Sequence, residues 1–194
     1  MNPAARSQCT PEAFERRYHE RSDPWHFRTS LYERNRYETT LAALSCDRYA
    51  CAFEPGCSIG ELTALLAPRC DQLLATDVSA TAVEQARQRC ASWGNVRIEC
   101  ADVREVILEP SPDLIVLSEI AYYFDSAELA RLAVRLGNAL RAGGTLIAVH
   151  WLGESPDHVL HGDEAHKVLL RSLPLQHEVG ERHAGFRLDR WVRQ

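Results

Sequence analysis

The stretch YACAFEPGCSIGELTALLA, from Tyr49 to Ala67, determines the fold class of this chain. Its first part, YACAFE (Tyr49 to Glu54), is a short apolar run that leads directly into a turn containing two glycines. A helical pattern follows from Glu61 to Ala67. Because a buried strand, a short turn and a helix form the first half of a βαβ unit, the stretch predicts a parallel sheet covered by helices.

The same alternation continues toward the C-terminus. Four more apolar runs predict strands, namely QLLATD (72–77), VRIECAD (96–102), DLIVLSE (113–119) and TLIAVHW (145–151). Helices are predicted between them over 80–93, with Ser79 as the N-cap, and over 126–140, before the glycine stop at Gly143. Two alternating segments, 176–182 and 186–192, predict an antiparallel hairpin. The pattern as a whole is that of a doubly wound, Rossmann-like α/β sheet.

Residues 1–44 differ from the rest because they contain no predicted sheet strand. Aromatic side chains gather instead in a polar, helical pattern: Phe14, Tyr18, Trp25, Phe27, Tyr32 and Tyr37. We expect one domain, with residues 45–194 as the Rossmann-like core and residues 1–44 as a helical lid.

Composition favours a globular protein that acts on a small molecule. The 194 residues are 45% hydrophobic and 25% charged, and the net charge is -5. The basic residues are scattered, which argues against nucleic acid and anionic membranes as partners. The N-terminal sequence lacks the apolar core of a signal peptide, so we expect a cytoplasmic protein.

Cysteine and histidine spacing predicts no metal site. Seven cysteines occur without a CxxC pair, which favours neither a disulfide framework nor zinc. A polar stretch carries His158, His161, Asp163 and His166, but their spacing matches no standard metal site. We expect this stretch to be a solvated loop.

The glycine turn lies where parallel sheets bind nucleotides. Gly56 and Gly60 are spaced GxxxG and follow Glu54, whereas a nicotinamide site has GxGxxG. The run from Glu54 to Gly60 resembles the first motif, ExGxGxG, of class I S-adenosylmethionine methyltransferases, with Ser58 in place of the middle glycine. The resemblance implies that this loop, with Cys57, holds the cofactor and that Glu54 engages its ammonium.

Two carboxylates at later strand ends extend the cofactor hypothesis. Asp77 follows Gly56 by 21 residues, the distance at which a carboxylate reaches both ribose hydroxyls. The resemblance implies that Asp102, after the third strand, accepts a hydrogen bond from the adenine amino group. We expect Val78 and Val103 to lie against the cofactor beside them.

Over nearly the whole chain the sequence looks like the nodulation protein S family of methyltransferases. Three segments carry the resemblance: SDPWHFRTSLYERNRYETTLAAL (22–44), FEPGCSIGELTALLAPRCDQLLATDVS (53–79) and DLIVLSEIAYYF (113–124). It implies the class I strand order 3-2-1-4-5-7-6 with strand 7 antiparallel. It also implies methylation of the amino group of a glucosamine residue in a chitooligosaccharide.

The acceptor side is expected where the fourth strand ends. Glu119 is the first candidate for a carboxylate that orients a substrate ammonium, with Ser118 toward the cofactor and Tyr122 on the pocket wall. A carboxylate at this point also serves as a helix cap or pairs with an arginine, and these alternatives stay open. His150, at the end of the fifth strand, is a candidate acceptor for the amine proton, and a packed histidine is the alternative. Trp25 is expected to close over the cofactor.

These observations lead to a small-molecule methyltransferase that uses S-adenosylmethionine, acting first on an amine such as an amino sugar. Transfer to oxygen and a non-catalytic cofactor-binding protein are the alternatives. Nothing in the sequence separates a monomer from a homodimer.

Overall fold

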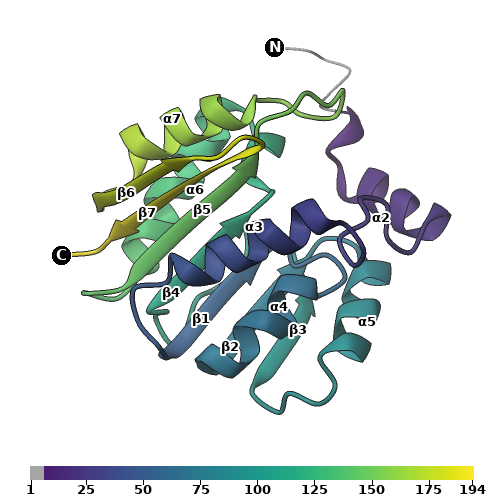
Figure 1. The fold of residues 1–194 in the computed structure, drawn as a ribbon, viewed down its shortest axis with the longest axis horizontal. Helices are drawn as coiled ribbons and strands as arrows, with labels where there is room; N and C mark the ends of the chain where they lie inside the picture. Colours follow the sequence, from purple (N-terminus) through teal and green to yellow (C-terminus); the bar gives the residue numbers. More distant parts are fainter. Residues whose placement is uncertain (1–6) are drawn as a thin grey trace.

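A seven-stranded sheet forms the centre of the fold in the computed structural model, which describes residues 7–194 (Figure 1). Its order is β3-β2-β1-β4-β5-β7-β6, as the class I resemblance implies. Among the strands described, β7 runs antiparallel to both of its neighbours, β5 and β6, and the other neighbouring pairs are parallel. The strands are β1 (Tyr49–Pro55), β2 (Cys70–Asp77), β3 (Val96–Cys100), β4 (Leu114–Ser118), β5 (Thr145–Trp151), β6 (Gln176–Arg182) and β7 (Phe186–Val192).

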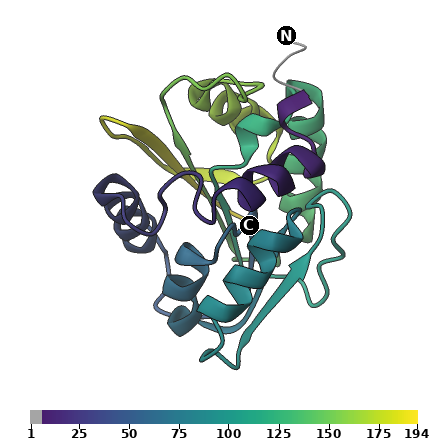
Figure 2. The same cartoon turned by 90° about the vertical axis from the view of Figure 1, so that its right-hand side faces the viewer.

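Helices cover both faces of this sheet (Figures 1 and 2). One face carries α6 (Ser126–Ala139) and α7 (Gly162–Ser172), and the other carries α3 (Leu31–Ala42), α4 (Glu61–Leu66) and α5 (Ala80–Arg89). The strand β4 is therefore buried on both sides. Ile115 belongs to the same hydrophobic cluster as side chains of α6, and Leu114 to the same cluster as side chains of α4. A strand buried on both faces reads as a continuous apolar run, which is why DLIVLSE does not alternate.

Most predicted element boundaries are confirmed within a few residues. Ser79 caps α5 by accepting a hydrogen bond from the Ala82 N–H, as predicted. The same helix ends at Arg89, earlier than the predicted Trp93, because the chain turns at Cys90. The strand β3 ends at Cys100, which leaves Asp102 in the loop beyond the sheet.

The N-terminal segment is helical in its described part. Thr10 caps α2 (Pro11–Glu20), and Ser30 caps α3. Figure 1 shows α2 beyond the carboxyl ends of the strands, and Figure 2 views this end directly. Residues 1–6 of the expected lid lie outside the described part. None of the described helices combines the length and hydrophobicity needed to span a bilayer.

Candidate active site

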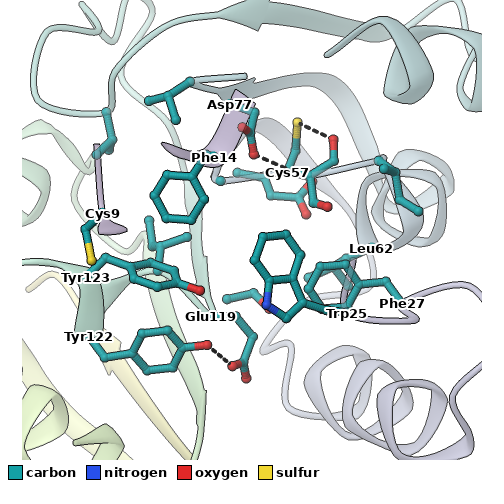
Figure 3. A pocket seen from close by; sticks show the side chains of 18 of the residues that line it. Cys9, Phe14, Trp25, Phe27, Cys57, Leu62, Asp77, Glu119, Tyr122 and Tyr123 are labelled. Atoms are coloured by element: carbon teal, nitrogen blue, oxygen red, sulfur yellow. Dashed lines mark hydrogen bonds between the residues drawn. The ribbon is translucent and has the colours of Figure 1, made fainter. Parts of the chain in front are cut away.

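A cavity of about 590 Å³ lies at the carboxyl ends of the central strands, between them and the N-terminal segment. Figure 3 shows Asp77 at one end of it, Glu119 and Tyr122 at the other, and Phe14 and Trp25 between. Twelve of the fourteen predicted site residues line the cavity: Trp25, Glu54, Gly56, Cys57, Ser58, Asp77, Val78, Asp102, Val103, Ser118, Glu119 and Tyr122. Gly60 and His150 do not.

The glycine loop is wound tightly between β1 and α4. Gly56 has φ of +73°, and a Cβ at this position would come within 2.1 Å of the Ile120 side chain. Ser58, in place of the middle glycine, keeps a left-handed backbone with φ of 52°. Its hydroxyl accepts a hydrogen bond of 2.5 Å from Tyr18 in α2. The departure from the glycine pattern therefore joins the loop to the N-terminal segment.

Gly60 has a different role from the one expected. It lies outside the cavity lining, with φ of +82° at the start of α4. A Cβ there would approach Ala86 in α5 to 3.0 Å. This glycine allows α4 and α5 to pack closely, which corrects the expectation that it contacts the cofactor.

Asp77 is held by two backbone donors at the end of β2. Its Oδ2 accepts from the Ser58 N–H and its Oδ1 from the Ser79 N–H, both at 2.9 Å. Burial raises the pKa of the carboxyl. Each oxygen keeps one lone pair for a further donor. The arrangement suits a ligand with two adjacent hydroxyls, and the contact with a ribose stays a prediction.

Glu54 is a buried acid with an unused acceptor. Its exposed fraction is 2%, and its Oε2 is enclosed without a hydrogen-bond partner. Burial raises the pKa of this carboxyl to about 8. Because a buried carboxylate requires a partner, the site is complete only when a donor or a cation approaches it. An ammonium in the cavity meets that requirement.

Asp102 lines the cavity but already holds an internal partner. Its carboxylate accepts from the Arg104 backbone N–H at 2.8 Å and from the guanidinium at 2.9 and 3.0 Å. Although burial opposes the effect, Arg104 holds the pKa of Asp102 below its usual value. A hydrogen bond to an adenine amino group stays a prediction here.

Glu119 stands at the opposite end, held by two hydrogen bonds and one ion pair. Oε1 accepts from the Trp151 N–H at 2.9 Å and lies 3.4 Å from Arg36 Nε. Oε2 accepts from the Tyr122 hydroxyl, the contact drawn in Figure 3. Glu119 therefore pairs with an arginine, one of the alternatives raised by the sequence, and it also lines the cavity. Burial raises the pKa of Glu119 despite Arg36.

Arg36 of α3 connects this end to the N-terminal segment. It is 1% exposed and donates to Glu33 and, at 2.6 Å, to Ser118 Oγ. One guanidinium thus lies between two carboxylates, those of Glu33 and Glu119. The cluster carries a net negative charge when all three groups are ionised.

His150 lies behind the cavity wall and not on it. The ring is 0% exposed, and its Nε2 accepts from the Ala121 N–H at 2.9 Å. A neutral imidazole carries one proton, so Nδ1–H donates to His166 Nε2 at 3.0 Å. His166 Nδ1 in turn donates to Asp189 at 2.5 Å, and Asp189 also meets His177 at 2.7 Å. With its lone pair engaged, His150 does not take a proton from a ligand, which corrects the prediction.

The loop after β5 is more ordered than expected. His166 is 0% exposed inside α7, and His161 caps that helix. Asp163 pairs with Arg182 at 2.5 Å. His158 stacks on Tyr122, so the solvated-loop interpretation was wrong for most of these residues. Within the described part of the chain, no three potential ligand side chains converge to hold a metal ion.

The helix α2 is bonded to three separate parts of the core. Besides the bond from Tyr18 to the glycine loop, Glu15 accepts from Ser79 at 2.5 Å and from Thr81 at 2.6 Å. Arg17 pairs with Asp157, in the loop after β5, at 2.9 Å. These contacts place the helix as a roof across the cavity.

The lining is acidic and aromatic. Among the described residues, seven acids and two arginines line the cavity. Ten aromatic side chains contribute to the walls, with Trp25 5.5 Å from Tyr18 and 5.7 Å from Phe27 between ring centroids. Negative charge and aromatic faces both favour cationic ligands.

Sequence reasoning missed the parts of the site that depend on contacts between distant elements. The three-residue spacing of Glu33 from Arg36 indicates an ion pair on one face of a helix. It does not indicate that this pair lies beside the cavity. His158 carried none, because a loop has no periodicity from which to infer a direction. Arg28, Tyr32 and Arg36 share a helical spacing that predicts an inner face of the lid. Tyr32 and Arg36 line the cavity, and Arg28 does not.

Comparisons with known proteins agree with this geometry. The family model described as Nodulation protein S (NodS) matches residues 8–165. The nodulation protein S of Bradyrhizobium diazoefficiens is 35% identical over 127 residues, which cover 64% of this chain and 61% of that protein. The match therefore spans about three fifths of that relative's length.

Two solved structures resemble the whole fold. A protein described as a putative methyltransferase from Pseudomonas syringae is 38% identical, with a TM-score of 0.74, covering 84% of this chain and all of that one. The N-methyltransferase NodS from Bradyrhizobium japonicum WM9, in complex with S-adenosylhomocysteine, is 25% identical. Its TM-score is 0.82, and the match covers 94% of this chain and 98% of that one.

Proposed function

The chain belongs to the nodulation protein S family, and from that premise and its cavity we propose that it is an S-adenosylmethionine-dependent N-methyltransferase of a small molecule. The observation that carries the proposal is one continuous cavity with two chemically different ends. One end is the glycine loop with Asp77, and the other is the carboxylate of Glu119 with Tyr122. A methyl donor and an acceptor need such adjoining sites.

At the donor end the chain's groups match those of S-adenosylmethionine. The free lone pairs of Asp77 suit the two ribose hydroxyls, and the partnerless Oε2 of Glu54 suits the aminoacyl ammonium. When bound, this cofactor supplies an activated methyl group on a sulfonium. The acidic lining and the aromatic faces around Trp25 stabilise that positive charge.

At the acceptor end the net charge favours an amine. Glu119 and Glu33 flank a single guanidinium, Arg36, so a substrate ammonium is attracted and oriented there. Oε2 of Glu119 faces the Tyr122 hydroxyl and keeps a lone pair for the ligand. An alcohol gains no comparable electrostatic attraction, so nitrogen is the favoured nucleophile.

The carrier of this amine is an amino sugar or a related glycoconjugate. The family relationship supports this choice, and the aromatic walls of the cavity are compatible with the apolar face of a sugar ring. The reaction then transfers one methyl group to the amino nitrogen, and one proton is lost.

A methyl-transfer screen with labelled S-adenosylmethionine tests the proposal. The substrates are glucosamine, chitosan oligosaccharides and small amines, each paired with its N-acetylated or hydroxyl counterpart. Label is expected on the free amines and not on their counterparts, and S-adenosylhomocysteine should bind while NAD does not.

The alternative functions give different results in this screen. Label on the hydroxyl counterparts would identify an O-methyltransferase. Cofactor binding without label in any acceptor would indicate a non-catalytic binder, and tighter binding of NAD would overturn the cofactor assignment.

A further inference from the structure

The proposed N-methyl transfer requires a group that removes a proton from the acceptor, and His150 is not that group. A substrate ammonium has no lone pair, so it must lose one proton before nitrogen attacks the methyl carbon. The base has to lie on the cavity wall, within hydrogen-bond reach of the ligand. The identity of this base rests on the proposed function and concerns the same site.

Most titratable groups on the described cavity wall are unsuited to this task. Burial raises the pKa of the lining tyrosines, including Tyr122 and Tyr123, so they remain protonated at neutral pH. The thiol of Cys9 is likewise protonated, since burial raises its pKa to about 11. Glu119 accepts two hydrogen bonds, pairs with Arg36 and is needed as an anion to attract the ammonium.

His158 is the one histidine among the described lining residues. Its ring stacks on Tyr122 with centroids 3.7 Å apart and planes 20° apart, and it meets the edge of Trp151 at 5.9 Å. Its Nδ1 is enclosed and has no hydrogen-bond partner. In contrast to His150, this imidazole is not committed to a network within the protein.

The ring is also held close to the carboxylate that orients the ligand. Tyr122 presents its face to His158 and its hydroxyl to Glu119, so one side chain contacts both groups. The neighbouring Asp157 is anchored to α2 by Arg17 at 2.9 Å, and its backbone carbonyl accepts from the thiol of Cys9, just before α2, at 2.8 Å. The roof helix thereby positions the loop that carries the ring.

We propose that His158 is the catalytic base, which takes the proton of the acceptor ammonium while Glu119 orients the nitrogen. The N–H bond breaks and its electron pair stays on nitrogen, as imidazole becomes imidazolium. The neutral amine then forms the N–C bond as the C–S bond of the methyl donor breaks. The products are a methylated ammonium and S-adenosylhomocysteine, and His158 returns its proton to water.

The surroundings of His158 keep it neutral at physiological pH. Burial is the largest influence and lowers the pKa of the ring, while Asp157 opposes it. The titratable and charged groups around the ring, from all elements packed against it, are Asp157, His161, Arg17, Tyr122, Tyr123 and His150. A neutral imidazole is the form that accepts a proton.

The test compares His158→Gln with a control, His183→Gln, in the half-exposed hairpin turn between β6 and β7. With the best amine from the screen at pH 7, His158→Gln should lower kcat about 100-fold, the range for a positioned base. The affinity for S-adenosylhomocysteine should stay within twofold. The control should match the wild type in both measurements.

The pH profile separates a base from a structural residue. Without a base, the variant depends on amine that is already deprotonated in solution, so its defect should shrink steadily toward pH 9.5. A defect of equal size at pH 7 and pH 9.5, or full activity at pH 7, would overturn the assignment.

A measurement without turnover distinguishes failure of this inference from failure of the proposed function. In the complex with S-adenosylhomocysteine, ¹⁵N spectra of the imidazoles should show that glucosamine shifts the His158 titration, and the His183→Gln variant should show the same response. If amines are methylated while His158 does not respond, only the base assignment fails. If no amine is methylated and His158 does not respond, both fail.

Discussion

Glu119 combines a strained backbone with a side chain whose two carboxylate oxygens each accept a hydrogen bond. Its φ of 60° is in the left-handed region, which costs a non-glycine residue about 1 to 2 kcal/mol. The conformation directs the carboxylate back to the Trp151 N–H and the Tyr122 hydroxyl. Strain held by such contacts is typical of functional sites.

Replacing Glu119 by Gln should separate binding from turnover. The amide keeps the shape but removes the charge that holds an ammonium, so we expect methyl transfer to fall roughly 100-fold or more. Affinity for S-adenosylhomocysteine, measured by calorimetry, should not change, because Glu119 lies at the acceptor end. Glu178→Gln, on the edge strand β6, is the control. Loss of cofactor binding or full activity in Glu119→Gln would contradict the acceptor role.

Glu54 should couple cofactor binding to proton release. Its pKa of about 8 means that the carboxyl is largely protonated at pH 6.5 before binding. A bound ammonium stabilises the anion and lowers that pKa, so affinity rises with pH and binding releases up to one proton. Calorimetry of S-adenosylhomocysteine at pH 6.5, in buffers of different ionisation enthalpy, measures the release. Release of the same size in Glu54→Gln would show that another group is responsible.

The helix α2 is attached to the core mainly through polar contacts. Few apolar side chains of this helix are buried, namely Ala13 and Tyr18, so its position depends on polar contacts to the glycine loop and to α5. Elements attached in this way open more easily than core strands. A ligand that contacts both the loop and Trp25 should therefore stabilise the closed arrangement.

Hydrogen exchange should slow in this segment when the cofactor binds. We expect greater protection over residues 11–37 with S-adenosylhomocysteine and little change in α7, which lies away from the cofactor end. Tyr18→Phe removes the bond to Ser58 and should raise exchange in α2 of the free protein. Equal protection with and without ligand would mean that the segment is static and not a lid.

Two buried histidines should make the stability of the whole molecule depend on pH. Burial lowers the pKa of His150 and of His166, and both rings are 0% exposed between β5, α7 and β7. The unfolded chain therefore binds protons at these rings below about pH 6.5, while the folded chain does not. Their contribution to the free energy of unfolding is present above pH 6.5 and is lost as the pH falls. Each ring lowers this free energy by about 1.4 kcal/mol for each pH unit. Burial of Glu54 has the opposite effect, because it raises the pKa of the carboxyl to about 8. Between the pKa in the unfolded chain and about pH 8, it lowers the stability as the pH rises.

Comparison with a variant isolates the histidine contribution. His166→Gln should be less stable than the wild type at pH 7.5, because the chain from His150 to Asp189 is interrupted. The difference in unfolding free energy, measured with urea, should shrink by at least about 1 kcal/mol between pH 6.5 and 5.5. The control His183→Gln, at a half-exposed position in the hairpin turn, should run parallel to the wild type. A constant difference for His166→Gln would show that the buried rings titrate normally.

The sequence alone determined the sheet and the donor end of the cavity. Strands, turns and helices follow from local patterns of burial and backbone hydrogen bonding, so the alternation from Tyr49 onward predicted the α/β sheet. Each donor-end residue lies at the end of its own strand. Because the carboxyl ends of parallel strands share one edge, spacing along the chain brought Glu54, Gly56 and Asp77 together.

The acceptor end was decided only by the tertiary structure. It is assembled from α3, the end of β4 and the loop after β5, whose separation in the sequence carries no information about contact. His150 and His158 lie eight residues apart, but the lone pair of His150 accepts the Ala121 N–H, whereas His158 lines the cavity and its Nδ1 has no hydrogen-bond partner. Whether an imidazole can take a proton depends on the partner that already occupies its nitrogen, and folding alone places that partner.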